Sequence, residues 1–134
     1  MLGKVQKRLG KWTSLTVSDL TSLNIESAKM AYLSASNTST MRDIRLLDES
    51  ITLANAFQLS GYSSVVGSLW GVMDPCTAEV ARSVYEWILK DGILDIRLSA
   101  EGLHKAVHSL RDRTRTRHSN DDPLIWATYI HNGV

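Results

Sequence analysis

Two short apolar runs separated by one helical stretch constrain the fold of this chain more than any other feature. The runs cover residues 28–35 (AKMAYLSA) and, richer in β-branched residues, 64–70 (SVVGSLW). Between them Asp48 is a candidate N-cap, and Gly61 stands where a glycine often ends a helix. A strand, a crossover helix and a second strand favour a parallel pair with a right-handed connection. The sequence therefore predicts an α/β fold with a mostly parallel sheet flanked by helices.

Two further helices follow these strands. The first is expected to begin at Asp74 and Pro75, because proline is well placed in a first helical turn, and Gly92 is expected to close it. The second is expected to be capped by Ser99 and to carry an apolar face as far as Leu110.

The last part of the chain is expected to be a polar connection followed by one more strand. Residues 111–120 (RDRTRTRHSN) form the connection, and residues 126–131 (WATYIH) form a strand or a strand-like edge. Because no internal repeat or linker interrupts the pattern, we expect one unit over residues 13–134, preceded by a basic segment over 1–12.

Composition narrows the classes of function. Lys plus Arg number 15 and Asp plus Glu 14, which argues against a strongly basic nucleic-acid binder. No window reaches the roughly 20 apolar residues of a membrane helix, so we expect no membrane partner. A single cysteine cannot close an intrachain disulfide, which favours a reducing compartment such as the cytoplasm.

The basic segment MLGKVQKRLGKW leaves two interpretations open. Its apolar residues could share one helical face, as in an amphipathic anchor or an organelle presequence. A solvated chain terminus is the simpler interpretation, and we favour it.

Isolated candidate side chains give weak signals for chemistry. His104 and His108 have the spacing of two metal ligands on a helix, but no third ligand is evident, so we predict surface histidines and no metal. Cys76 is expected to be a partly buried, unreactive thiol, and the arginines of 111–117 are expected to be solvated. No phosphate loop, dinucleotide fingerprint or paired-cysteine motif occurs, so we expect no cofactor.

Sheet geometry points to two loops. In open parallel sheets, sites form at the carboxyl ends of the strands. The loops that leave the two predicted strands there are residues 36–40 and 70–74. Trp70 ends the second strand, so it is a candidate site residue or a packing residue.

Several segments of the chain resemble the C-terminal part of CHAT domains, which are caspase-like, separase-related peptidase domains often attached to tetratricopeptide repeats. The resemblance covers most of residues 15–134 and implies a caspase-like three-layer sandwich that is incomplete on its N-terminal side. The segments that carry it are LTVSDL (15–20), AYLSAS (31–36), LDESITLANAFQLSGYSSVVGSLWGVMD (47–74), ARSVYE (81–86) and PLIWATYIHNG (123–133).

The resemblance also implies where catalytic residues would lie. The family uses a cysteine at the end of an LSAC-type strand, and this chain has Ser36 at that position. The family's histidine lies upstream of that strand, in a half of the domain that we expect to be absent from this chain. Trp70 and Asp74 would border the pocket for the residue before the scissile bond, although Asp74 is explained more simply as a helix cap.

Three hypotheses of function follow. The first is an inactive CHAT-like domain that binds a protein or peptide, possible partners being tetratricopeptide-repeat regions or a completing chain. The second is half of an active cysteine-type endopeptidase, and the third is a binding module unrelated to proteolysis. An incomplete sheet would expose the 28–35 strand as an edge, so we also predict marginal stability for the isolated chain.

Overall fold

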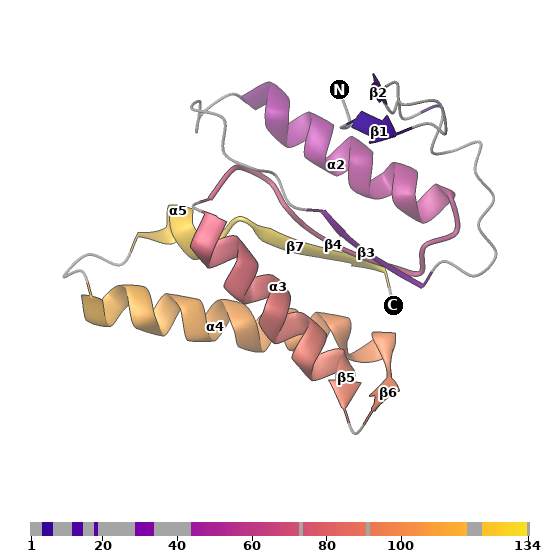
Figure 1. Ribbon diagram of the computed structural model, residues 1–134. Coiled ribbons are helices and arrows are strands. Elements are labelled where there is room, and N and C mark those ends of the chain that lie inside the picture. The colour runs from indigo at the N-terminus through magenta and orange to yellow at the C-terminus, as the bar shows by residue number, and fades with distance from the viewer. Residues whose placement is uncertain are drawn as a thin grey trace.

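The computed structural model describes residues 4–6, 12–14, 18, 29–33, 44–72, 74–90, 92–117 and 122–133. Its main sheet has three strands in the order β3-β4-β7. These are β3 (Met30–Leu33), β4 (Ser64–Ser68) and β7 (Tyr129–Gly133). Figure 1 shows β4 between the other two strands. All five residues of β4 are buried, as expected of a central strand.

The sheet is mixed. β3 runs parallel to β4, with Leu33 opposite Gly67, as the predicted strand–helix–strand unit requires. β7 runs antiparallel to β4, with Tyr129 opposite Ser68 and Gly133 opposite Ser64. The described sheet therefore confirms the α/β class, whereas a mostly parallel sheet is not confirmed.

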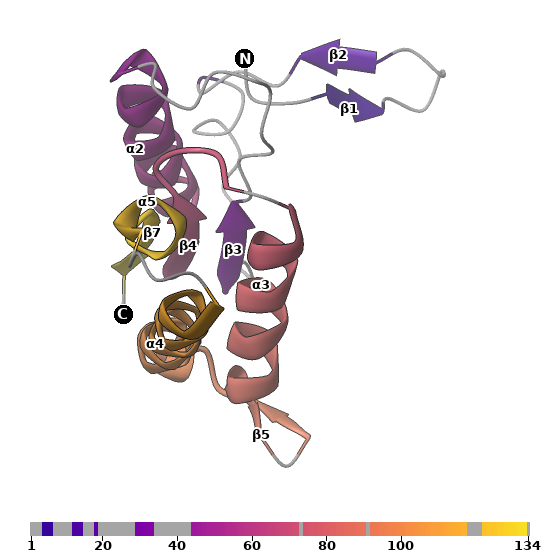
Figure 2. The ribbon, with the colours of Figure 1, turned by 90° about the vertical axis from the view of Figure 1, so that its left-hand side faces the viewer.

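Helices cover both faces of this sheet. One face carries α2 (Ile44–Leu59), and the other carries α3 (Asp74–Ile88) and α4 (Ser99–Arg117), as Figure 2 shows. The two neighbouring valines of β4 face opposite ways: Val65 packs with Ala54 beneath α2, and Val66 packs with the core of α3 and α4. A three-layer α/β/α arrangement results from this alternation.

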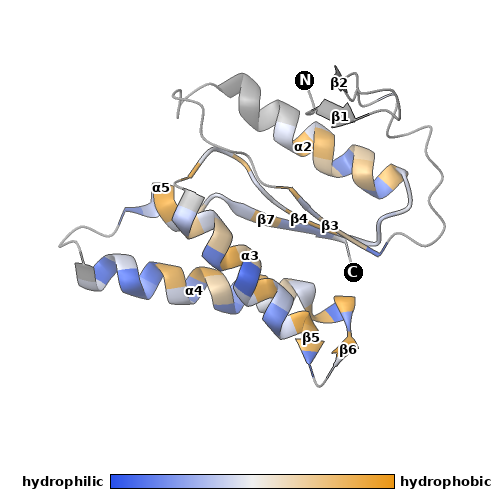
Figure 3. Cartoon of the chain, viewed as in Figure 1, coloured by the Kyte–Doolittle hydropathy of each residue, from blue (hydrophilic) through white to orange (hydrophobic). Residues whose placement is uncertain are grey.

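The remaining elements are short. β1 (Lys4–Gln6) and β2 (Trp12–Ser14) pair antiparallel, and so do β5 (Leu89–Lys90) and β6 (Ile93–Leu94). A 3₁₀ turn, η1 (Ile96–Leu98), precedes α4, and α5 (Pro123–Trp126) precedes β7. Figure 3 shows apolar colour on the β5–β6 hairpin, where Leu89, Ile93 and Leu94 are exposed.

The end of α2 confirms the predicted glycine stop. Gly61 has a φ of 104°, a conformation that glycine adopts without strain. Its N–H donates to the Gln58 carbonyl, and the Tyr62 N–H donates to the Phe57 carbonyl, which is the pattern of a Schellman motif. The Phe57 and Tyr62 rings contact each other at 5.1 Å, which supplies the apolar contact that accompanies this motif.

Four predicted element boundaries were wrong, the first being the end of the 64–70 strand, because β4 stops at Ser68. Asp48 is not an N-cap, because α2 already begins at Ile44. Gly92 does not close α3, which ends at Ile88; it lies in the turn between β5 and β6 with a φ of 76°. The last strand begins at Tyr129 and not at Trp126, which is the final residue of α5.

The expected polar connection at 111–120 was also wrong over its first seven residues. α4 continues to Arg117, because Arg113 forms an ion pair with Glu79 of α3 and Arg111 lies over the Trp126 ring. The hydroxyl groups of Thr114 and Thr116 donate to carbonyls three residues earlier. Tertiary contacts thus stabilise a segment that lacks an apolar stripe.

Candidate functional site

The carboxyl end of β4 is where the sequence places candidate site residues. Of these, Trp70 is fully described, and Ser36 lies outside the described residues. Asp74 is the first residue of α3, as predicted, but its side chain also lies outside the described part, so its capping and pocket roles both stay predictions. The structure therefore does not test whether the three residues come together.

Trp70 is held by α5 and by Thr128, the residue before β7. Its indole Nε1–H donates to the Leu124 carbonyl at 2.8 Å, and its backbone N–H donates to Thr128 Oγ1 at 3.0 Å. The Thr128 hydroxyl donates back to the Trp70 carbonyl at 3.0 Å, while the Thr128 carbonyl accepts the Leu69 N–H at 2.9 Å. We call this group of hydrogen bonds between Leu69, Trp70, Leu124 and Thr128 the tryptophan anchor.

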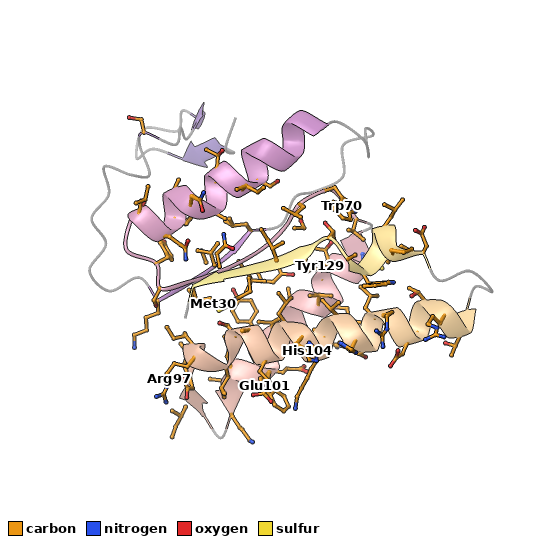
Figure 4. All side chains as sticks on the ribbon, turned by 180° about the vertical axis from the view of Figure 1, so that it is seen from behind. Met30, Trp70, Arg97, Glu101, His104 and Tyr129 are labelled. Atoms are coloured by element: carbon orange, nitrogen blue, oxygen red, sulfur yellow. The ribbon has the colours of Figure 1, made fainter. Side chains whose placement is uncertain are left out.

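The tryptophan anchor limits what Trp70 can offer a ligand. Thr128 has 0% exposure, so its hydroxyl has no access to water that could replace the two bonds to Trp70. Because the indole N–H already has an acceptor, only the partly exposed ring of Trp70 remains for contact with a peptide. Figure 4 shows Trp70 near the start of β7, where Tyr129 is labelled.

The amino end of β4 carries a second polar cluster, which the sequence did not predict. His131 Nε2 lies 3.0 Å from Ser64 Oγ and 3.0 Å from Ser99 Oγ, and the two serine oxygens are 2.7 Å apart. Ser64 begins β4, Ser99 begins α4, and His131 lies in β7. We call these three side chains the serine–histidine clasp.

Burial governs the chemistry of the clasp. Both serines have 0% exposure, so no substrate can reach their hydroxyl groups without unfolding of the surrounding structure. Burial also lowers the pKa of His131, because the charged imidazolium loses hydration there. The cluster therefore holds a neutral histidine inside the fold and is not a catalytic serine site.

The isolated candidates have the exposures that the sequence predicted. His104 and His108 are exposed on α4 with ring centroids 4.2 Å apart, and no group of three possible metal ligands occurs among the described residues. Figure 4 shows His104 and Glu101 on the side of α4 away from the sheet. Cys76 is half-buried and packs against the core between α3 and α4.

No helix within the described ranges is both long and apolar enough to cross a membrane.

Comparison with known families identifies the chain. The family model for the CHAT domain matches residues 2–134. Neither the curated proteins nor the solved structures gave a significant match. CHAT domains imply a caspase-like fold, and the three-layer arrangement around β4 is compatible with one. With this match over the whole chain, the protein belongs to the CHAT domain family.

Proposed function

We propose that this CHAT-family chain has no peptidase activity and acts by binding a protein or peptide partner. The observation that carries the proposal is Ser36, which stands where the family has its nucleophilic cysteine.

A serine at this position requires more help than a cysteine does. A thiol has a pKa near 8.5, so a neighbouring histidine readily produces the reactive thiolate. A serine hydroxyl stays protonated at neutral pH and needs a base within about 3 Å during the reaction. The Ser36 substitution therefore removes most of the reactivity unless a base is close.

His131, the one histidine that the sequence placed in a strand, is already engaged elsewhere. Its Nε2 contacts Ser64 and Ser99 at the amino end of β4, whereas Ser36 follows β3, whose last residue pairs with Gly67 toward the carboxyl end. His104 and His108 are exposed on α4. This arrangement favours an inactive domain.

A binding role accords with one edge of β3 and with the carboxyl end of the sheet. Among the described strands, β3 pairs with β4 alone, so one edge of β3 is a candidate for an added strand from a partner. The partly exposed Trp70 ring and Asp74 lie at the carboxyl end, where a basic peptide side chain would pair with a carboxylate. Tetratricopeptide-repeat regions or a completing chain in the cytoplasm are partners of this kind.

Peptide turnover tests the inactive part of the proposal. The purified chain is incubated with fluorogenic peptides that contain Arg or Lys, beside Ser36→Ala and Ser36→Cys. We expect the wild-type rate to equal that of Ser36→Ala. Wild-type turnover that Ser36→Ala abolishes would overturn the proposal. Activity gained only in Ser36→Cys would identify the serine as the inactivating change.

Peptide binding without cleavage tests the second part. Fluorescence anisotropy with the same Arg-containing peptide should show saturable binding to the wild-type chain. Asp74→Asn should weaken it by roughly tenfold, the effect of losing a charge-assisted hydrogen bond worth about 1.5 kcal/mol. Asp112→Asn, on the exposed face of α4, is the matched control. An absence of saturable binding would contradict a peptide-binding role.

A further inference from the structure

The serine–histidine clasp joins three elements that are far apart in the chain. Ser64 and Ser99 are separated by 35 residues, and Ser64 and His131 by 67. Each side chain contacts both of the others, at 2.7 to 3.0 Å. The clasp therefore fixes the start of β4, the start of α4 and strand β7 to one another.

The hydrogen bonds of the clasp fit a neutral imidazole with Nε2 unprotonated. In that form one serine donates to Nε2 and the other donates to the first serine, so that each hydroxyl proton has an acceptor. Protonation of Nε2 removes the acceptor, and a hydroxyl that has 0% exposure must find another. Protonation thus costs hydrogen bonding inside the cluster.

The position of α4 also disfavours a charged imidazole. Ser99 is the first residue of α4, so Nε2 lies at the helix end that carries partial positive charge. An imidazolium at this end is repelled, in addition to the cost of burying it.

Among the residues that the structure describes, the charged groups of the surrounding elements do not offset these costs, and Lys29, whose carbonyl accepts the Ser64 N–H, is itself a cation. β4 contains no charged side chain, and the only other titratable group of β7 is Tyr129, at its far end. In α2 the charged residues all precede Ser50, whose hydroxyl contacts the Leu69 carbonyl near the opposite end of β4. Near the start of α4, Asp95 pairs with Arg97 and Glu101 with Lys105. Burial is accordingly the cause of the lowered pKa of His131.

We propose that the serine–histidine clasp is an acid-sensitive latch. Protonation of His131 opens it and releases β7 and the start of α4 from β4. The latch is independent of the proposed peptide-binding function, because it lies at the other end of the sheet from Trp70 and is closed to ligands.

The direction of the pH effect follows from linkage. The folded chain holds His131 with a pKa below the usual value, which is about 6.5 in an unfolded chain. At pH values just below 6.5 the unfolded state therefore binds more protons than the folded state. The stabilisation is fully present above about pH 6.5 and is lost as the pH falls through the folded pKa of His131.

Denaturation at several pH values tests the latch in the full chain. As the pH falls from 7.5 to 5, the unfolding equilibrium constant of the wild type should rise. The rise should reach up to about tenfold per pH unit where the unfolded state binds one more proton than the folded state. His131→Gln keeps a polar group of similar reach and cannot become an imidazolium, so the part of this rise that depends on His131 should disappear. His104→Gln, in an exposed histidine, is the matched control and should leave the rise unchanged. Parallel profiles for wild type and His131→Gln would overturn the proposal.

A second measurement uses only the wild-type chain, so that the proposal stays testable if His131→Gln fails to fold. In wild type, NMR titration should place the midpoint of His131 below the ordinary histidine value of about 6.5. Amide exchange in β7, corrected for intrinsic rates, should accelerate with the same midpoint as His131. A His131 midpoint at or above about 6.5 would overturn the latch, and so would β7 exchange whose rate does not change with the protonation of His131.

Discussion

The two ends of β4 are tied to the same neighbouring strand by different chemistry. At the carboxyl end the tryptophan anchor uses backbone groups, a threonine hydroxyl and an indole N–H. At the amino end the clasp uses two serines and a histidine. No group in the tryptophan anchor ionises near neutral pH, whereas the clasp contains one that does. The carboxyl end, where the sequence places candidate site residues, is therefore held independently of pH, and the opposite end is sensitive to acid.

The largest effect should come from Thr128→Val, which tests the tryptophan anchor directly. Valine has nearly the same shape but leaves the Trp70 N–H and carbonyl without their partner at a position with 0% exposure. We expect a loss of about 2–6 kcal/mol in the free energy of unfolding, from about 1–3 kcal/mol for each of the two unsatisfied groups. Urea denaturation at pH 8 and pH 5.5 measures it.

Comparing the loss of stability at the two pH values tests whether the two ends of β4 are stabilised independently. Thr128→Val should lose the same amount at both pH values, because threonine does not titrate. Thr128→Ser, which keeps the hydroxyl, is the control and should retain most of the stability. A Thr128→Val loss that shrinks markedly at pH 5.5 would mean that the two ends of β4 are not independent.

Local signals made part of this structure predictable from the sequence. The strand at 64–68 and the stop at Gly61 depend on β-branched residues and on one glycine conformation, both of which a short window reveals. The continuation of α4 to Arg117 depends on Glu79 and Trp126, which are distant in the chain. A polar segment of this kind can be predicted as a helix only when the positions of its tertiary contacts are known.

The site was less predictable than the fold for the same reason. Trp70 was predicted to end the second strand, but β4 ends at Ser68, and the bonds of Trp70 to Leu124 and Thr128 cross more than 50 residues of chain. Ser99 was assigned to a helix start and His131 to a strand, and both positions were correct. Nothing in their spacing indicated that they meet each other and Ser64.

The second-largest effect should come from Gly133→Ala at the amino end. Gly133 has a φ of 116°, and a Cβ there would overlap the carbonyl oxygen of Ser63. Backbone strain of this type costs about 1–3 kcal/mol, so we expect a destabilisation of that size. Because Gly133 pairs with Ser64, His131 should also titrate at a higher pH, as β7 loosens and its ring regains water. NMR titration combined with urea denaturation checks both; an unchanged stability would show that the end of β7 adjusts without cost.

A smaller effect is expected from Trp70→Phe. Phenylalanine preserves most of the ring packing but removes the indole N–H that donates to the Leu124 carbonyl. That hydrogen bond is accessible to water, so we expect a loss near the lower end of the 0.5–1.5 kcal/mol that a typical hydrogen bond contributes, about 0.5 kcal/mol. Thermal unfolding followed by circular dichroism measures it. A loss above about 2 kcal/mol would mean that the indole fills a packing role that the ring of phenylalanine cannot replace.

The smallest effect should come from Gly67→Ala, the matched glycine toward the carboxyl end of β4. Gly67 has no positive φ, and a Cβ there would lie 3.4 Å from Leu33 Cβ, an ordinary van der Waals distance. Alanine also lowers the conformational entropy of the unfolded chain, a gain of about 0.4–1 kcal/mol that offsets slight crowding against Leu33. We therefore expect a stability within about 0.5 kcal/mol of wild type, measured beside Gly133→Ala under the same conditions. If Gly67→Ala were as destabilising as Gly133→Ala, close packing of β3 on β4, and not backbone conformation, would explain why glycine occurs at these positions of the sheet.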